Sequence, residues 1–221
     1  MDVEHWIVDG GSTDNTLEII EANQSQGMRV ISENDDGIYA ALNRGIKLAS
    51  GEVIGFLNAD DVFENADVLK SVAKTLAAPE VDGCYADLLY VRENDLSHVV
   101  RFWKSEPFEK GAFLKGWMPP HPTFYARATV YREIGGFRTD MRIGADWEFL
   151  LRFFEKEKRT ARYVPQTWVR MRLGGVSNRN IKNVLRNNFD TWRVCCAEFG
   201  FLPSLLFPIR KWIHRLKQFV R

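Results

Sequence analysis

The nonapeptide VIGFLNADD, residues 53–61, joins a continuous apolar run to two adjacent aspartates. Residues 53–57 have the composition of a central strand, because strands that are covered on both faces are apolar throughout. Asp60 and Asp61 follow directly, just beyond the carboxyl end of that strand. Ligands of open α/β sheets bind at this end. The stretch therefore predicts an α/β protein with a candidate site at residues 60 and 61.

Strand-like and helix-like patterns alternate on both sides of this stretch. Short β-branched runs and helical apolar spacing predict strands at residues 3–8 and 28–32, and helices at residues 12–23, 38–49 and 69–76. Strands joined by crossover helices form a mostly parallel sheet. Residues 83–91 and 97–103 predict a strand and a returning strand around the turn Asn94-Asp95, which makes the second half of the sheet mixed.

The chain beyond Pro107 is less regular and rich in aromatic residues. Residues 123–126 predict a strand, and residues 146–156 predict a helix with Asp146 at its start. After Gly174-Gly175 the pattern is helical to residue 221, apart from a break at Pro203. The expected fold class is a mixed α/β sheet with helices on both faces, followed by C-terminal helices.

Composition and charge exclude several classes of function. The chain has 30 basic and 29 acidic residues and a net charge of +1, so no overall field attracts nucleic acid. Its three cysteines match neither a disulfide framework nor a zinc ligand set, which favours a reducing, cytoplasmic setting. No run of about 18 apolar residues predicts a membrane span, and residues 1–5 lack the pattern of a signal peptide. We expect a protein that is neither exported nor embedded.

Two acidic loops carry candidate binding chemistry. Asp60 and Asp61 are suited to a divalent cation, because Mg²⁺ is typically held by one or two carboxylates plus substrate phosphates. Such an ion would neutralise a diphosphate leaving group. The alternative is a helix N-cap followed by an acid in the first turn. In the loop at residues 9–14, Asp9 is placed to accept hydrogen bonds from a base or ribose, or it belongs to an ordinary strand-to-helix turn.

Five stretches then appear in one order at regular distances. They are IVDGGSTDNT (7–16), SENDDGIYAALNRGIKLASGEVIGFLNADD (32–61), HPTFYARATVYREIGGF (121–137), GADWEFLLR (144–152) and GGVS (174–177). Together they resemble family 2 glycosyltransferases, particularly those that build bacterial surface polysaccharides such as O-antigen and colanic acid. The resemblance covers roughly residues 3–180, and the ordered set is far more specific than any one member.

The resemblance implies a GT-A fold, a nucleotide-diphosphate sugar as donor, a glycan or lipid-diphosphate-linked acceptor, Mg²⁺ or Mn²⁺, and inversion at the anomeric carbon. Asp9 falls on the family's nucleotide-binding acid, and Gly10 stands where a second acid is common. Asn58-Ala59-Asp60 overlies the Asp-x-Asp motif with its first acid replaced, so metal binding is expected at Asp60 and Asp61. Gly10, Ser12, Asp36, Asn58 and Asp60 complete the expected nucleotide-binding set with Asp9.

The resemblance also places the base and the acceptor contacts. Asp146 falls on the catalytic base, which deprotonates the acceptor hydroxyl as it attacks opposite the leaving diphosphate; capping of its own helix is the alternative. His121 is expected to contact the acceptor or a phosphate, or to be a buried structural histidine. Arg170 and Arg172 are expected to meet the diphosphate from a mobile loop, with solvated arginines as the alternative.

The C-terminal tail is a second unit by this interpretation, with a glycosyltransferase domain at residues 1–178 and a helical extension at 179–221. Residues 199–221 mix large apolar side chains with basic ones, which suits an interface with anionic lipids. That would place the protein peripherally on the inner face of the cytoplasmic membrane. The alternative is a helix docked on the protein's own core with a solvated basic face.

The chain departs from the family at its start. Relatives begin with an apolar strand and a helix before the strand that opens this chain, and the missing strand would lie centrally beside the nucleotide. Its loss is expected to expose a strand edge. Either the true start lies upstream, or the chain is a natural fragment with impaired donor binding. A degenerate member that binds a partner or glycan without catalysis is therefore the second hypothesis, and a nucleotidyltransferase is disfavoured because no Gly-rich phosphate loop carrying Lys or Arg occurs.

Overall fold

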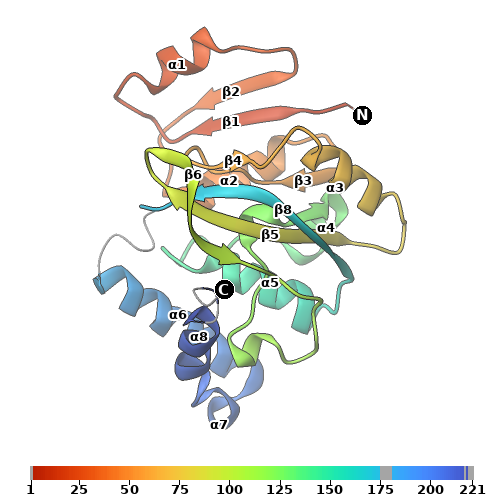
Figure 1. Ribbon diagram of the computed structural model, residues 1–221, viewed down its shortest axis with the longest axis vertical. Helices are drawn as coiled ribbons and strands as arrows, with labels where there is room; N and C mark the ends of the chain where they lie inside the picture. Colours follow the sequence, from red (N-terminus) through yellow and green to blue (C-terminus); the bar gives the residue numbers. More distant parts are fainter. Residues whose placement is uncertain (1, 175–180, 217, 219–221) are drawn as a thin grey trace.

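The computed structural model describes residues 2–174, 181–216 and 218, and it has a mixed α/β architecture (Figure 1). A two-stranded sheet and a six-stranded sheet lie on one side of the molecule, and the C-terminal helices lie at the opposite end (Figure 1). The expected α/β class, with a parallel first part and a mixed second part, is confirmed.

The two-stranded sheet is formed by the first strand–helix–strand unit. Strands β1 (His5–Asp9) and β2 (Met28–Ser32) are parallel and are joined by helix α1 (Thr16–Ala22). The helix begins later than the sequence pattern predicts, because Asp14 Oδ1 accepts hydrogen bonds from the amide and hydroxyl of Thr16 and holds the preceding loop outside the helix. Helix α2 (Ile38–Leu48) follows and packs beside β1.

The six-stranded sheet contains the rest of the strands that the structure describes. They are β3 (Val53–Gly55), β4 (Val62–Phe63), β5 (Gly83–Arg92), β6 (Asp95–Trp103), β7 (Tyr125–Arg127) and β8 (Ala161–Arg172). The hydrogen-bonded order is β3-β7-β5-β8-β4, and β6 also pairs with β5. β5 is parallel to β8 and antiparallel to β6 and β7. The predicted hairpin at residues 83–103 is confirmed.

The expectation that residues 53–57 form a central strand is wrong. β3 has three residues, stands at the end of the strand order and pairs antiparallel with β7. Gly55 lies against the ring of Tyr125, where an added Cβ would come within 2.1 Å of a ring carbon. Beyond it the chain leaves the sheet, and Leu57 is 41% exposed. Within the described residues, the edges of β1 and β3 that face each other bear no hydrogen-bonded strand.

Strand β8 is the longest in the fold, although the sequence pattern did not predict it. Pro165 interrupts the apolar pattern, and a proline inside a strand normally indicates an edge or a bulge. The structure has a bulge there: Tyr85 pairs with Tyr163, but Asp87 pairs with Thr167. The irregularity accommodates the missing N–H and allows the strand to continue to Arg172.

The core beneath the large sheet is dominated by aromatic side chains. Helices α4 (Ala128–Ile134) and α5 (Ala145–Leu151) contribute buried faces to it, and a π-helical turn at Arg152–Lys156 extends α5 as the sequence predicts. Helix α3 (Val68–Leu76) packs in a second hydrophobic cluster. Short 3₁₀ turns at Phe113–Lys115 and His121–Thr123 also contribute buried residues. Phe113, Phe124, Phe149, Phe153 and Phe154 pack within this core.

The described residues after position 180 contain three helices, α6 (Ile181–Phe199), α7 (Phe201–Ser204) and α8 (Phe207–Leu216). The predicted break at Pro203 is wrong. The chain breaks at Gly200, whose φ of 85° suits glycine, while Pro203 lies in the short helix α7. Among the described helices, none combines the length and apolar character that a membrane crossing needs. Residues 175–178, with most of the GGVS stretch and the expected domain boundary, lie outside the described residues.

Candidate active site

A cleft of about 2040 Å³ runs between the two sheets and the C-terminal helices. Its walls include Trp6 and Val8 of β1, Tyr39 of α2, Ile54 of β3, Asp146 of α5 and Lys211 of α8. The facing edges of β1 and β3 form one side of it. The cleft therefore gathers residues from both ends of the chain around one space.

Asp60 and Asp61 stand in the turn that follows β3, in different environments. Asp60 is exposed and lines the cleft with Asn58. Asp61 is 4% exposed, and its Oδ2 accepts a hydrogen bond from Asn58 Nδ2 at 2.9 Å. Burial raises the pKa of Asp61 to about 6, with the charge of Asp60 acting in the same direction and the Asn58 hydrogen bond against it. The pair is therefore not a simple helix cap, because α3 begins at Val68.

The turn fits a divalent cation that phosphates help to hold. Asp61 Oδ1 is buried and has no hydrogen-bond partner among the described residues. Such an atom normally has a partner, and a cation satisfies a carboxylate oxygen well. No group of three or more Asp, Glu, His and Cys side chains suited to a metal occurs in the described part of the chain. Asp60 and Asp61 would thus supply the one or two carboxylates with which Mg²⁺ is typically held when substrate phosphates complete its coordination.

Asp146 lies in the first turn of α5 and lines the cleft. It makes no capping bond to the helix, whose N-cap is Gly144 in the left-handed conformation. Instead its Oδ1 accepts a hydrogen bond from the hydroxyl of Tyr39 at 3.1 Å. The same hydroxyl accepts a bond from the amide of Gly144 at 2.9 Å. The carboxylate is therefore held toward the cleft by a side chain from α2.

His121 also lines the cleft, in the 3₁₀ turn before β7. Its ring stacks on Phe56 at 6.1 Å between centroids and meets Phe137 edge-on at 5.6 Å. Nδ1 is buried with no partner among the described residues. Burial lowers the pKa of His121, and the nearby charge of Asp146 opposes that shift. The neutral imidazole is thus favoured next to the carboxylate.

The loop after β1 is organised around Asp9, which does not reach the cleft lining. Asp9 Oδ2 accepts hydrogen bonds from the amides of Gly11 and Ser12 and from the hydroxyl of Ser32, and Oδ1 accepts one from the Ser12 hydroxyl. These bonds lower the pKa of Asp9 to about 2, the Ser12 hydroxyl contributing most. Gly10 lies against Asp35, so a side chain there would press on that carboxylate. The loop ties β1 to β2.

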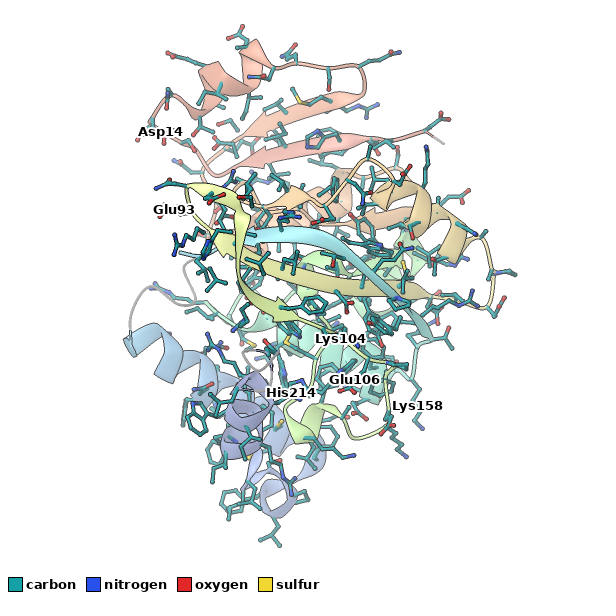
Figure 2. The ribbon with its side chains drawn as sticks, in the orientation of Figure 1. Asp14, Glu93, Lys104, Glu106, Lys158 and His214 are labelled. Atoms are coloured by element: carbon teal, nitrogen blue, oxygen red, sulfur yellow. The ribbon has the colours of Figure 1, made fainter. Side chains whose placement is uncertain are left out.

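Arg170 and Arg172, at the end of β8, bond to protein groups rather than line the cleft. Arg170 pairs with Glu64 at 2.7 Å and donates to the carbonyl of Leu96. Arg172 donates to the backbone carbonyls of Asp60 at 2.6 Å and of Glu93. Arg172 therefore fixes the backbone of the acidic turn. Figure 2 labels Glu93, one of its partners, on the side of the molecule toward which β1 and β5 point, where Asp14 is also labelled.

The structure brings part of the predicted set together and adds residues that the sequence did not single out. Asp36, Asn58, Asp60, His121 and Asp146 line one cleft, whereas Asp9, Gly10, Ser12, Asp61, Arg170 and Arg172 do not. The cleft also contains Tyr39, Tyr90, Arg101, Lys211, His214 and Arg215. The helical spacing of Lys211, His214 and Arg215 was the available signal, but it does not show which side of the helix faces the site.

A family model described as Glycosyl transferase family 2 matches residues 1–143. The PGL/p-HBAD biosynthesis glycosyltransferase of Mycobacterium tuberculosis H37Ra is 32% identical over 167 residues, which is 74% of this chain and 62% of the mycobacterial one. An uncharacterised glycosyltransferase of Nostoc sp. is 35% identical over 97 residues, 42% of this chain and 30% of that protein. The chain thus spans less than two thirds of the length of these relatives.

Solved structures of similar fold include two sugar-nucleotide complexes. S. aureus TarS 1-349 in complex with UDP-GlcNAc matches with a TM-score of 0.62 and 18% identity, over 92% of this chain and 57% of that one. The mannosyltransferase PcManGT from Pyrobaculum calidifontis, in complex with GDP-Man and Mn²⁺, matches with a TM-score of 0.59 and 18% identity, over 97% and 65%. At this identity the likeness establishes the fold.

Proposed function

This chain belongs to glycosyl transferase family 2 and has the GT-A fold of that family, and on this premise we propose that it transfers a sugar from a nucleotide-diphosphate donor to a glycan or lipid-linked glycan acceptor. The observation that carries the proposal is the cleft itself. Asp60 and Asp146, far apart in the sequence, line the same space. The proposed reaction needs two carboxylates in one space: one to remove the proton of the acceptor hydroxyl, and one to hold the ion that neutralises the leaving diphosphate.

Asp146 is the proposed general base. An inverting transfer needs a carboxylate that removes the proton of the acceptor hydroxyl while the oxygen attacks opposite the leaving diphosphate. The hydrogen bond from Tyr39 fixes the orientation of Asp146 and leaves Oδ2 for the acceptor. His121, neutral and close by, shapes the acceptor side of the cleft.

Asp60 and Asp61 would hold Mg²⁺ or Mn²⁺, and the ion would neutralise the charge on the leaving diphosphate. The exposed carboxylate of Asp60 and the unpartnered Oδ1 of Asp61 support this assignment. PcManGT was solved with Mn²⁺ and GDP-Man, and TarS with UDP-GlcNAc. On this basis we propose that this chain, too, uses a divalent ion and a nucleotide-sugar donor. Asp36 and Asn58 lie in the cleft where they would meet the nucleotide.

The tip formed by α7 and α8 is the proposed membrane contact of the helical extension at residues 179–221. Its exposed apolar side chains are Phe201, Leu202, Leu205, Leu206, Ile209, Trp212, Ile213 and Leu216. Leu202 is 82% exposed and Trp212 is 63% exposed. Exposed apolar side chains on short helices, with a tryptophan among them, suit the interface of a bilayer. The contact would bring a lipid-linked acceptor to the cleft, in surface polysaccharide biosynthesis on the inner face of the membrane.

A second candidate is a family member that binds without catalysis. It is favoured by the carboxylate of Asp9, whose two oxygens already accept hydrogen bonds from Gly11, Ser12 and Ser32. Gly10 also stands where the family resemblance makes a second acid common. Titration calorimetry with UDP-sugars and GDP-sugars, with and without Mn²⁺, separates the candidates. The transferase predicts metal-dependent donor binding and release of nucleoside diphosphate on addition of acceptor. Absence of metal-dependent binding to every donor tested would exclude it.

A further inference from the structure

Two polar side chains of helix α2, one turn apart, hold the two ends of a single loop. The loop, residues 135–144, joins α4 to α5. The hydroxyl of Tyr39 accepts a hydrogen bond from the amide of Gly144, the last residue of the loop. Asn43, four residues further along α2, binds the loop near its start, at Phe137. Residues four apart lie on the same face of a helix, so one face of α2 contacts both ends of the loop.

The side-chain amide of Asn43 pairs with both backbone polar groups of Phe137. Its Nδ2 donates to the carbonyl at 2.7 Å, and its Oδ1 accepts from the N–H at 2.8 Å. The preceding residue has to be small, because a Cβ added at Gly136 would lie 2.2 Å from Asn43 Oδ1. Gly136 is not among the glycines with a positive φ. The close approach of Asn43, rather than backbone strain, therefore favours glycine at this position.

Helix α2 is itself fixed, and the start of the loop is held from a second side as well. Tyr39, Leu42 and Ile46 pack against the aromatic core. Arg152, in the π-helical turn after α5, donates to the carbonyl of Gly136 at 2.8 Å. The first residues of the loop are therefore fixed between α2 and the end of α5, and Asn43 supplies the contact from α2.

The loop leads directly to the proposed base and forms part of the cleft. Asp146 lies two residues beyond the end of the loop. Four side chains of the loop line the cleft: Thr139, Met141, Arg142 and Ile143. Asn43 is not one of the described residues that line it, so any effect of Asn43 on the site has to pass through the loop. Misplacement of a reacting group by about 1 Å can lower a rate about 100-fold.

We propose that Asn43 is a positioning residue for Asp146. Its paired hydrogen bonds to Phe137 fix loop 135–144 on α2, and the loop in turn fixes the carboxylate and the adjoining wall of the cleft. Tyr39 holds the other end of the same loop. The proposal rests on the proposed function for the role of Asp146 as the base, whereas the anchoring of the loop by Asn43 does not depend on that role.

The first test is the kinetics of Asn43→Ala in the full chain, with the folded fraction of each variant measured by urea denaturation. The variant should lower kcat per folded chain about 10-fold, because both hydrogen bonds to Phe137 are lost. KM for the donor should change less than about twofold, because the loss affects the loop and not the donor. Thr160→Val is the matched control: Thr160 bonds to the backbone carbonyl of Glu80 and does not line the cleft. Its kcat should equal that of the wild type.

A second variant perturbs the same contact from the side of the loop. Gly136→Ala should lower kcat, because the new Cβ displaces the side chain of Asn43. In the Asn43→Ala background the same substitution should have little further effect, since the atom that it meets has been removed. Effects of the two substitutions that multiply in the double variant would show that they act separately and would overturn the proposal.

Hydrogen exchange measures the anchoring of the loop without any activity. The amides of loop 135–144 should exchange about 10-fold faster in Asn43→Ala than in the wild type, and no faster in Thr160→Val. Unchanged exchange in Asn43→Ala, or faster exchange with a wild-type kcat, would overturn the proposal. A wild-type chain that transfers no sugar but shows this exchange pattern would contradict the proposed function and leave the anchoring by Asn43 standing.

Discussion

The hydroxyl of Tyr39 lies 3.1 Å from Oδ1 of Asp146 and joins two helices that are distant in the sequence. Tyr39 lies in the first turn of α2, just after the loop that contains Asp36, and Asp146 lies in the first turn of α5. The hydroxyl also accepts a hydrogen bond from the Gly144 amide. Burial, the charge of Asp146 and its hydrogen bond all raise the pKa of Tyr39, so the phenol stays protonated and donates to the carboxylate.

Replacement of this hydroxyl tests whether Tyr39 positions the base. Tyr39→Phe should lower kcat about 10-fold and change KM for the donor little, because one hydrogen bond to a charged group is lost. Tyr131→Phe is the control: the Tyr131 hydroxyl is buried without a partner among the described residues. Steady-state kinetics of both variants provide the comparison. Equal kcat values for the two variants would exclude a positioning role.

The metal assignment predicts a specific defect at Asp61. Asp61→Asn should weaken Mn²⁺-dependent donor binding by more than about tenfold, because a direct ligand matters at least as much as the groups that orient ligands. Asp67→Asn, at the N-cap of α3, is the control for a surface carboxylate. Calorimetry at saturating and at zero Mn²⁺ measures the difference. Donor binding that stays as metal-dependent in Asp61→Asn as in the wild type would show that other residues bind the ion.

The lowered pKa of Lys211 predicts how stability changes with pH. Its pKa, about 8, lies below the ordinary lysine value of 10.5, so the unfolded chain binds more protons between these values and the free energy of unfolding rises with pH. Asp146 of α5, Cys195 of α6 and Arg215 face this amine. Lys211→Met removes the effect, so at pH 7 the variant should be more stable than the wild type.

Urea denaturation at pH 7 and pH 10 checks this prediction. The stability advantage of Lys211→Met should shrink by about 1 to 3 kcal/mol between the two pH values. Groups that titrate in both proteins cancel in the difference. A difference in stability that stays constant, or widens, would show that the amine of Lys211 is solvated.

The apolar tip of α7 and α8 predicts binding to lipid vesicles. The double variant Leu202→Glu, Trp212→Glu should co-sediment with anionic vesicles at least about tenfold more weakly than the wild type, because two exposed apolar side chains are replaced by charges. Ile19→Glu is the control, since Ile19 is an exposed apolar residue of α1 at the other end of the molecule (Figure 1). If all three proteins co-sedimented with the vesicles to the same extent, the proposed membrane contact would be excluded.

Local patterns predicted the elements whose pairing partners are near in sequence. The strand at residues 28–32 matches β2, and the hairpin at 83–103 matches β5 and β6, because β-branched runs and a turn signal specify both. β8 could not be predicted from the pattern around Pro165, because the bulge that tolerates the proline depends on pairing with β5, about 80 residues away. For the same reason the edge position of β3 was not foreseen.

In the candidate site, too, some residues could be predicted from local sequence and others depend on tertiary packing. Motif order identified Asp60 and Asp146, and the structure places both in one cleft. The engagement of Asp9 by Ser12 and Ser32 was not foreseen, because the second serine comes from the neighbouring strand. Lys211 and Arg215 belong to a helix whose orientation depends on the contact between Phe207 and Trp147. Side chains that depend on tertiary packing cannot be assigned from spacing alone.

The release of nucleoside diphosphate by Asp146→Asn, measured alongside its affinity for the donor, tests the central claim most directly. We predict that the variant binds the nucleotide sugar and Mn²⁺ as the wild type does and transfers no sugar to the acceptor, because the amide cannot remove the proton. An Asp146→Asn protein that transfers sugar at the wild-type rate would contradict it.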